Sequence, residues 1–562
     1  MIRTLRSVRV TNPDPGRYRF DFGRNLAGWA RLKKIRGPRG AVVTMRFIEE
    51  MGPDYGQLDT YVLKGGEPEV YEPRFTWHGF REVEVSGLPD APSVESVEAR
   101  VVHSAVEDAG HFECSNGLLN RILENCRWSM LSNMHGGVPS DCPHRERVGY
   151  TGDWGHVAAE AVMFQFDMAR FYTKWVADMS DAQNRESGFV PHSAPFEGGG
   201  GGPVWGAGYV VVPWHMYVYY GDQRILEENY GGMRLWMHYL KRHTDSDGIL
   251  VEEEPGSWNL GEWAPPGKIE IPPAFVNTCY YAYLARLMAR IAAVVGSEDD
   301  AREYKSLAQS IRRAVNARYL DRDKGQYCGG RQGANFFPLA FDLVPEPLAG
   351  AVFHRGVEII EKDNRSHFDT GILATPLVLE VLTRRDRADL AYTLMTQQTP
   401  PSFGDQIAKG ATTLWENWNG HGSHNHAMFG SVCAWFFKYL AGIRPDPDLP
   451  GFRHILMEPH PVGDLRFARA AYRCLRGRIA SEWRRDAGGF TWRIEVPAAS
   501  TATAGLPASQ PNEVTESGRS IASSPGVRFL GVEGGRVRCA LSPGRYDFRI
   551  TTQSPFPIGG RQ

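Results

Sequence analysis

The sequence predicts a multidomain fold in which a toroid of paired helices stands between two β-sandwich domains. Three observations indicate this fold. Residues 17–103 alternate apolar and polar side chains with a period of two, residues 115–440 repeat apolar positions every three or four residues, and residues 447–550 return to alternation. The length of 562 residues agrees, because at roughly 150 residues per domain three or four domains fit.

The N-terminal part is predicted to be antiparallel. Its alternating segments, 18–22, 41–47, 81–85 and 97–102, are separated by glycine and proline. Short alternating runs between turn residues are typical of strands with one buried face. We therefore expect an N-terminal β-sandwich.

The middle of the chain is predicted to be helical. Apolar residues recur at helical spacing over 119–130, where Ser115 or Asn116 can cap the helix. The stretch 280–295 is apolar on nearly all sides and ends at Gly296, and the acidic residues 298–300 then begin the next helix. Further helical patterns occupy 153–182, 209–220, 223–243, 347–362, 371–383, 386–398 and 426–441. Helices buried on more than one face suit two concentric layers, so we expect about ten to twelve helices in an (α/α) toroid.

Alternation returns near the C-terminus, in residues 490–496 and 545–550, and predicts a second β-domain. The stretch 498–511 is rich in Ala, Ser, Thr and Pro. We expect it to be a flexible loop within that domain.

Composition excludes several function classes. The chain has 63 basic and 65 acidic residues, so neither nucleic acid nor a membrane is an expected partner. Residues 1–10 have no apolar stretch behind their arginines, and the eight cysteines form no C-x-x-C pair. We therefore expect a cytoplasmic protein without a signal peptide and with reduced thiols, and neither a metal nor a cofactor. The sequence leaves a homodimer open.

A first polar motif occupies residues 140–154. It holds three carboxylates, Asp141, Glu146 and Asp153, with Arg145 and Arg147 between them. Proline and glycine exclude a continuous helix here, and irregular polar loops often carry binding and catalytic groups. The alternative is a loop held by ordinary ion pairs, with Asp153 as the N-cap of the next helix.

A second motif places Glu416 between Trp415 and Trp418, ahead of a polar loop. A carboxylate can activate water and flat rings can hold a sugar, although two tryptophans at helical spacing also suit a core. Two other loops combine tryptophan with polar groups, and one follows a glycine run, 198–202, that we interpret as a mobile lid. We expect these loops to form one pocket, lined by Trp205, Trp258, Trp263 and Trp415.

Residues 141–153, DCPHRERVGYTGD, resemble a signature of the bacterial α-L-rhamnosidases of glycoside hydrolase family 78. Residues 412–418, TTLWENW, resemble their second signature, and the likeness extends through 72–81, 425–427 and 440–443. The resemblance implies an (α/α)6 barrel at 111–444, between β-sandwiches at 1–110 and 445–562. It also implies an exo-acting hydrolase that releases terminal α-L-rhamnose, with inversion, from small glycosides or oligosaccharides.

The resemblance assigns roles to individual residues. It implies that Glu146 is the general acid and Glu416 the general base. Residues implied to hold sugar hydroxyls or contact the ring are Asp141, Arg145, Tyr150, Asp153, Trp205, Trp263 and His426. This chain departs from the family pattern with Tyr150 in place of Trp, Glu262 in place of Asp, and Ala207 in place of an acidic residue. The last two departures bear on which sugar is bound, so Glu262 is included among the predicted substrate-binding residues.

Three other functions are compatible with parts of the pattern. The histidines of 421–426 could bind zinc. An epimerase or lyase acting on another sugar could use a similar toroid. A carbohydrate-binding protein without catalysis is the third alternative, against which the presence of both Glu146 and Glu416 argues.

Overall fold

The computed structural model describes residues 2–50, 52, 54–196, 200–253, 258–486 and 489–551. The chain divides into two compact units. Unit 1 comprises Met1–Ala105, Ile122–Tyr150 and Gln406–Gly430, and unit 2 comprises Val106–Arg121, Thr151–Asp405 and Ser431–Gln562. Each unit is therefore assembled from segments far apart in the sequence.

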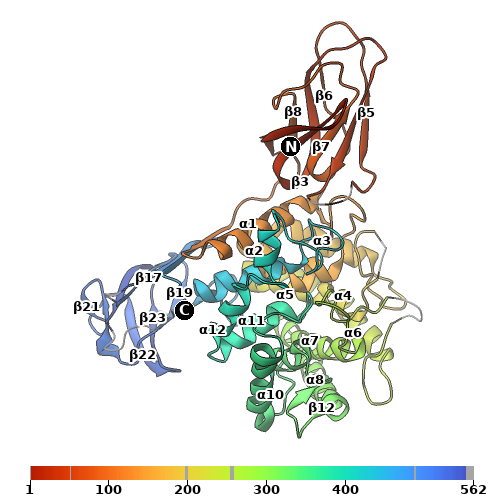
Figure 1. Cartoon of the computed structure of the whole chain (residues 1–562). Helices are drawn as coiled ribbons and strands as arrows, with labels where there is room; N and C mark the ends of the chain where they lie inside the picture. The colour runs from red at the N-terminus through yellow and green to blue at the C-terminus, as the bar shows by residue number, and fades with distance from the viewer. Residues whose placement is uncertain are drawn as a thin grey trace. The chain divides into compact units, whose positions relative to one another are not determined.

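Unit 1 contains an antiparallel sheet, which is coloured red in Figure 1. Its strands run in the order β1-β8-β3-β7-β4-β5, while β2 and β6 also pair with β3. The strands are β1 (Arg3–Arg6), β2 (Arg9–Asp14), β3 (Arg17–Ile35), β4 (Val42–Ile48), β5 (Leu58–Val62), β6 (Glu69–Tyr71), β7 (His78–Ser86) and β8 (Val97–Val101). Alternate residues of these strands, including Phe20, Leu32, Val83 and Ala99, form one buried apolar cluster. The four predicted strands are confirmed as β3, β4, β7 and β8. Hydrogen bonds join all eight strands into one sheet. A β-sandwich consists of two sheets packed face to face, so the predicted sandwich remains a prediction.

The rest of unit 1 is made of a helix and loops. Helix α1 (Gly117–Ser132) begins in unit 2 and continues into unit 1. Asn116 caps it as predicted, because its Oδ1 accepts the N–H groups of Leu118 and Leu119 at 2.9 and 3.3 Å. A short hairpin, β10 (Met134–His135) and β11 (Val138–Pro139), leads into the loop of the first motif.

Unit 2 holds most of the helices. They are η1 (Gly152–Val157), α2 (Ala159–Gln165), α3 (Ala169–Ala182), α4 (Pro203–Gly206), α5 (Gly208–Tyr220), α6 (Arg224–Arg242), α7 (Pro273–Val294), α8 (Glu298–Tyr319), α9 (Gln332–Ala340), α10 (Glu346–Glu358), η2 (Ile359–Asp363), α11 (Ala374–Arg384), α12 (Ala388–Met395), α14 (Cys433–Trp435) and η4 (Phe436–Leu440). Two more, α13 (Phe403–Ala408) and η3 (Met428–Val432), cross the boundary between the units, and β12 (Leu320–Asp321) pairs with β13 (Gln326–Tyr327).

The helical periodicity locates most of these elements correctly. Every predicted helical range contains a helix, and the predicted acidic start of α8 is confirmed. The range 153–182 is an exception in length: it contains η1, α2 and α3, because Phe166 is extended, with φ −132° and ψ 153°. Helices α4, α9 and α13 were not predicted. They span four, nine and six residues, and these lengths are too short for a helical repeat of apolar residues to be recognised in the sequence.

The C-terminal part of unit 2 contains two sheets. One has the order β14 (Ile443–Pro445), β15 (His454–Met457), β19 (Thr501–Leu506), β23 (Arg536–Leu541), β22 (Val527–Glu533). The other has the order β21 (Arg519–Ser520), β20 (Val514–Glu516), β24 (Gly544–Ile550), β18 (Gly489–Val496), β17 (Gly477–Asp486), β16 (Phe467–Cys474), β9 (Gly110–Cys114), and the one-turn η5 (Pro511–Glu513) precedes β20. The predicted second β-domain is thus confirmed as β-sheet. Strand β9 comes from before α1, so residues 110–114 pair with this C-terminal sheet and not with the N-terminal one.

The flexible loop predicted at 498–511 is wrong. Strand β19 lies there, parallel to β15 and antiparallel to β23. Ala502, Ala504 and Leu506 are buried. The small side chains that suggested flexibility instead allow a central strand to pack closely.

Two further expectations concern the whole chain. Seven of the eight cysteines are buried, and Cys328 is partly buried. Among the described residues, no helix combines the length and apolarity needed to cross a membrane. Part of the predicted lid, Gly198 and Gly199, lies outside the described residues.

Candidate active site

The loop of the first motif is irregular, as predicted, and is held by its own polar groups. Asp141 is buried, its Oδ1 accepts the Val148 N–H at 2.9 Å, and its N–H donates to the Val148 carbonyl at 3.0 Å. Arg147, with φ +57°, donates to the carbonyls of Pro143 and Trp77. In the structure Asp141 and Arg147 therefore shape the loop, whereas the predicted sugar contact of Asp141 remains a prediction.

Arg145 joins the two predicted catalytic residues. Its Nη2 donates to Glu416 Oε2 at 2.6 Å, and its Nε lies 3.3 Å from Glu146 Oε1. The Glu416 side chain is 10% exposed and that of Glu146 43%. The two motifs are 271 positions apart at the Arg145–Glu416 contact and are thus brought together within unit 1. Both carboxylates contact the same planar guanidinium, one through Nη2 and the other through Nε.

Each carboxylate has a second donor. The Ser423 N–H donates to Glu416 Oε2 at 2.8 Å, and the Tyr150 hydroxyl donates to Glu146 Oε2 at 3.0 Å. Gly422 fits closely against Glu416: it has φ +80°, and a Cβ there would lie 2.4 Å from Glu416 Oε2. Both described contacts of Glu416 use the same oxygen, Oε2.

Trp415 is buried against the N-terminal sheet segment of unit 1. Its Nε1 donates to Glu50 at 3.1 Å, and its ring stacks on His424 with centroids 4.4 Å apart. With about 2% of the residue exposed, Trp415 supports the loop of Glu416 instead of forming the open wall that the sequence predicted. His426 is also buried, and its N–H donates to the Leu414 carbonyl at 2.9 Å.

Asp153 and Trp205 meet within unit 2. The Trp205 indole N–H donates to Asp153 at 3.0 Å. The ring is buried, and it passes so close to Gly152 that a Cβ there would lie 2.8 Å from it. Asp153 lies inside η1, so it is not the N-cap of that helix. The predicted sugar-facing ring of Trp205 is covered in the structure, and its described role is to hold Asp153.

Glu262 is buried at the beginning of α11. Both of its oxygens accept the Ala374 N–H at 3.1 Å. Burial raises the pKa of Glu262 to about 8, although the hydrogen bonds from Ala374 and Gly371 oppose this. The carboxyl is engaged with a helix end and not presented to a ligand.

The two tryptophans of the same motif remain accessible. Trp258 is 58% exposed and Trp263 is partly buried, so these rings keep surface for a ligand. Ala207 is buried.

The zinc alternative finds no support in the geometry. His424 Nδ1 lies 2.7 Å from the Glu50 carbonyl, and its Nε2 lies 2.8 Å from the Gly420 carbonyl. Neither ring nitrogen is therefore left to bind a metal. In the part of the chain that the structure describes, no three His, Cys, Asp or Glu residues are grouped so as to hold a metal ion.

Sequence reasoning missed the residues that fix the Glu416 loop. Glu50 accepts hydrogen bonds from Thr412 and Trp415, and its pKa is raised to about 7, mainly by burial. Asn25 donates to Thr413 Oγ1 at 2.9 Å. The sequence signal that could have identified Glu50 is the acidic pair 49–50 directly after an alternating strand. Charged residues at a strand end are usually exposed, so this pair did not indicate a buried structural role.

Three family models match the chain. The bacterial α-L-rhamnosidase six-hairpin glycosidase domain matches residues 107–440, the concanavalin-like domain residues 11–103, and the C-terminal domain residues 442–520. The chain belongs to the bacterial α-L-rhamnosidase family. The resemblance seen in the two sequence signatures is thereby confirmed, and the three matches follow the order of the β-sheet, helical and β-sheet regions.

Individual α-L-rhamnosidases are also similar to this chain in sequence and in structure. The chain is 37% identical over 536 residues to an α-L-rhamnosidase of Streptomyces avermitilis, covering 91% of this chain and 50% of that protein. It spans about half the length of the curated relatives it matches. The structure of the α-L-rhamnosidase from Dictyoglumus thermophilum superposes with a TM-score of 0.90 at 35% identity, covering 98% of this chain and 64% of that one. The S. avermitilis enzyme complexed with L-rhamnose gives 0.89 at 34% identity, with coverages of 98% and 53%.

Proposed function

We propose that the protein is an exo-acting, inverting α-L-rhamnosidase that acts on small glycosides or oligosaccharides. The observation that carries the proposal is that the Arg145 guanidinium contacts both Glu146 and Glu416. Inverting glycosidases need two carboxyl groups that flank the scissile bond, with room for a water on one side. A guanidinium that contacts two carboxylates holds both groups near each other in defined orientations.

The two carboxyl groups divide the reaction. Glu146, the more exposed, gives its proton to the glycosidic oxygen as the bond from C1 to that oxygen breaks. Glu416 takes a proton from a water that attacks C1 from the opposite face, through the oxygen Oε1 that its described contacts leave unused. The products are the aglycone alcohol and β-L-rhamnose, and the proton gained by Glu416 returns to Glu146 through solvent.

The sugar is proposed to be rhamnose because a relative has been solved with L-rhamnose bound. Its 6-methyl group needs an apolar surface, and Trp258 and Trp263 keep exposed ring surface. We further propose the (α/α)6 barrel at 111–444 between sandwiches at 1–110 and 445–562, which the six-hairpin family match supports. Sugar contacts by Asp141, Arg145, Tyr150, Asp153 and His426 are part of the same proposal.

The first experiment is hydrolysis of an aryl α-L-rhamnoside by the wild type, followed by NMR. Early release of β-L-rhamnose supports both the activity and the inversion. Early release of the α-anomer overturns the inversion, and no release of rhamnose overturns the activity. An epimerised or unsaturated sugar would instead support the epimerase or lyase alternative, and binding of L-rhamnose without any product would support the binding protein.

Leaving-group dependence separates the acid from the base. We expect Glu146→Gln to lower kcat by about 10²- to 10⁴-fold on a poor leaving group such as methanol but far less on dinitrophenol, which departs without protonation. Glu416→Gln should lower kcat on both substrates, because both reactions need the water to be activated. Glu95→Gln, at an exposed glutamate of unit 1, is the control. Equal sensitivity of Glu146→Gln on both substrates would contradict its assignment as the acid.

A further inference from the structure

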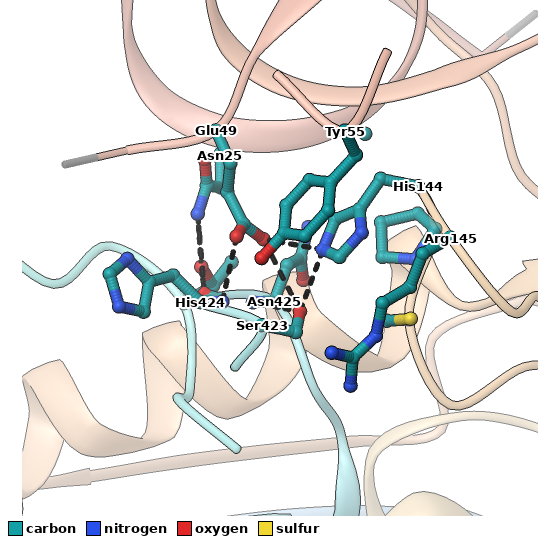
Figure 2. Close-up of polar contacts among 12 residues, drawn as sticks. Asn25, Glu49, Tyr55, His144, Arg145, Ser423, His424 and Asn425 are labelled. Carbon is teal, nitrogen blue, oxygen red and sulfur yellow. Dashed lines mark hydrogen bonds and ion pairs between the residues drawn. The ribbon is translucent and has the colours of Figure 1, made fainter. Parts of the chain in front are cut away.

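Glu49 is a buried carboxylate that the reaction above does not use. It follows directly after β4, and its side chain is 1% exposed. Burying a charge in this way is costly unless donors surround it. Figure 2 shows what surrounds it: the carboxylate of Glu49 points at Ser423, His424 and His144.

The contacts of Glu49 reach both catalytic loops. Its Oε2 accepts the His424 N–H at 2.9 Å, and its Oε1 lies 3.0 Å from His144 Nε2 and 3.3 Å from Ser423 Oγ. His144 immediately precedes Arg145, and the Ser423 N–H donates to Glu416. One side chain of the β-sheet segment thus contacts both the residue that precedes Arg145 and the residue whose main-chain N–H donates to the proposed base.

Ser423, His144 and Glu49 are also the residue types of a hydrolytic triad, but their geometry excludes that role. In a triad the imidazole contacts the serine through one nitrogen and the carboxylate through the other. Here the same nitrogen, His144 Nε2, lies 2.8 Å from Ser423 Oγ and 3.0 Å from Glu49. Nδ1 has no hydrogen-bond partner among the described residues. Ser423 Oγ accepts the Asn425 N–H at 3.0 Å, which is a structural contact.

Tyr55 completes the arrangement on the other side of the imidazole. Its ring stacks on His144 with centroids 3.9 Å apart and planes 1° apart. Its hydroxyl donates to the carbonyl of Gly422, the residue against Glu416, at 3.1 Å. The loop that carries Glu416 and the loop that carries Arg145 are therefore both held by Glu49 and Tyr55.

We infer that Glu49 is a positioning residue, which fixes the loop of Glu416 relative to the loop of Arg145 and Glu146. The inference rests on the proposed function for its effect on catalysis. A displacement of about 1 Å in a catalytic group can cost about 10²-fold in rate. Losing Glu49 should therefore affect turnover much more than substrate binding.

The test compares Glu49→Gln with Glu69→Gln in the full chain. Glu69 is the matched control: it is also a buried carboxylate of this β-sheet, and it accepts a hydroxyl from Tyr61 and the N–H groups of Lys64 and Gly65. We expect Glu49→Gln to lower kcat on an aryl α-L-rhamnoside by about 10- to 100-fold with KM changed less than about threefold. Glu69→Gln should leave kcat within about twofold. Equal kcat values for the two variants, at a temperature where both are folded, would overturn the inference.

Two further measurements keep the test decisive. In a double-mutant cycle, Glu49→Gln and His144→Asn should together lower kcat much less than the product of their single effects, because both substitutions remove the same contact. Multiplicative effects on kcat would count against the inference.

Crystal structures of the variants give a readout that does not depend on activity. The 2.6 Å contact from Arg145 to Glu416 should be lost in Glu49→Gln and kept in Glu69→Gln. If it is kept in both, Glu49 does not position the pair, whereas an inactive wild type would refute the proposed function alone.

Discussion

Gly422 shows how one missing Cβ can determine the position of a catalytic group. Its φ is +80°, and a Cβ added there would lie only 2.4 Å from Glu416 Oε2, so a side chain at this position would strain the backbone and force the Glu416 carboxylate to move. We expect Gly422→Ala to displace the carboxylate and lower kcat on an aryl α-L-rhamnoside by at least about tenfold. Gly410→Ala is the control, because Gly410 also has a positive φ, +102°, but has nothing within 4 Å of its Cβ position. Similar kcat losses in both variants would attribute the effect to backbone strain and not to Glu416.

At the same scale, sequence could identify the types of catalytic residue but not the orientation of their neighbours. Arg145, Glu146 and Glu416 were predicted from two signatures and meet in the structure. Trp205 and Trp415 were predicted as open walls and are buried. A tryptophan beside a carboxylate looks the same in a sequence whether its indole N–H holds that loop or its face meets a sugar, so burial decides the role.

At the scale of the elements, the first residue of α11 donates its N–H to the buried carboxyl group of Glu262, and the pKa of this group is raised. Burial raises the pKa of Glu262 from 4.5 to about 8, so the folded state keeps a proton that the unfolded state loses. The stabilisation is complete below about pH 4.5 and is lost as pH rises towards 8. We expect Glu262→Gln to reduce this fall in Tm between pH 5 and 8. Glu346→Gln, at an exposed first-turn glutamate of α10, should leave the slope unchanged, and an unchanged slope in Glu262→Gln would refute the assignment.

Lys438 of helix η4 pairs with two carboxylates from other helices. Lys438 Nζ lies 2.8 Å from Glu160 and 3.1 Å from Glu380. Burial by itself raises the pKa of Glu160, but the Lys438 ammonium, His215 and the Tyr219 hydroxyl together outweigh burial and lower it. We expect Lys438→Met to cost about 3 kcal/mol in free energy of unfolding at pH 7, since Glu160 and Glu380 both lose the cation that they contact. The cost should shrink near pH 4, where protonation relieves the repulsion. Urea unfolding at both pH values measures it, with Lys362→Met as an exposed control; a loss no larger than that of the control would contradict the prediction.

At the scale of the whole molecule, sequence order and structural units differ. Periodicity correctly divided the chain into β, helical and β regions, because period is a local property. It could not show that residues 406–430 belong to the same unit as the N-terminal sheet. That grouping depends on contacts such as Asn25 with Thr413, which are 388 positions apart, and no local pattern encodes them.

This grouping predicts that the helical region is not an independent enzyme. In a chain beginning at residue 107, the N–H of Thr412 loses its Glu50 acceptor, the N–H of His424 loses Glu49, and Thr413 loses Asn25. Each unsatisfied buried group costs about 1–3 kcal/mol, so the Glu416 loop should leave its position even where the helices form. We expect the truncated chain to keep helical circular dichroism while kcat falls by more than about 10²-fold. Wild-type turnover by residues 107–562 would show that the loop holds Glu416 without the sheet, and it would contradict the view that the N-terminal sheet is part of the active site.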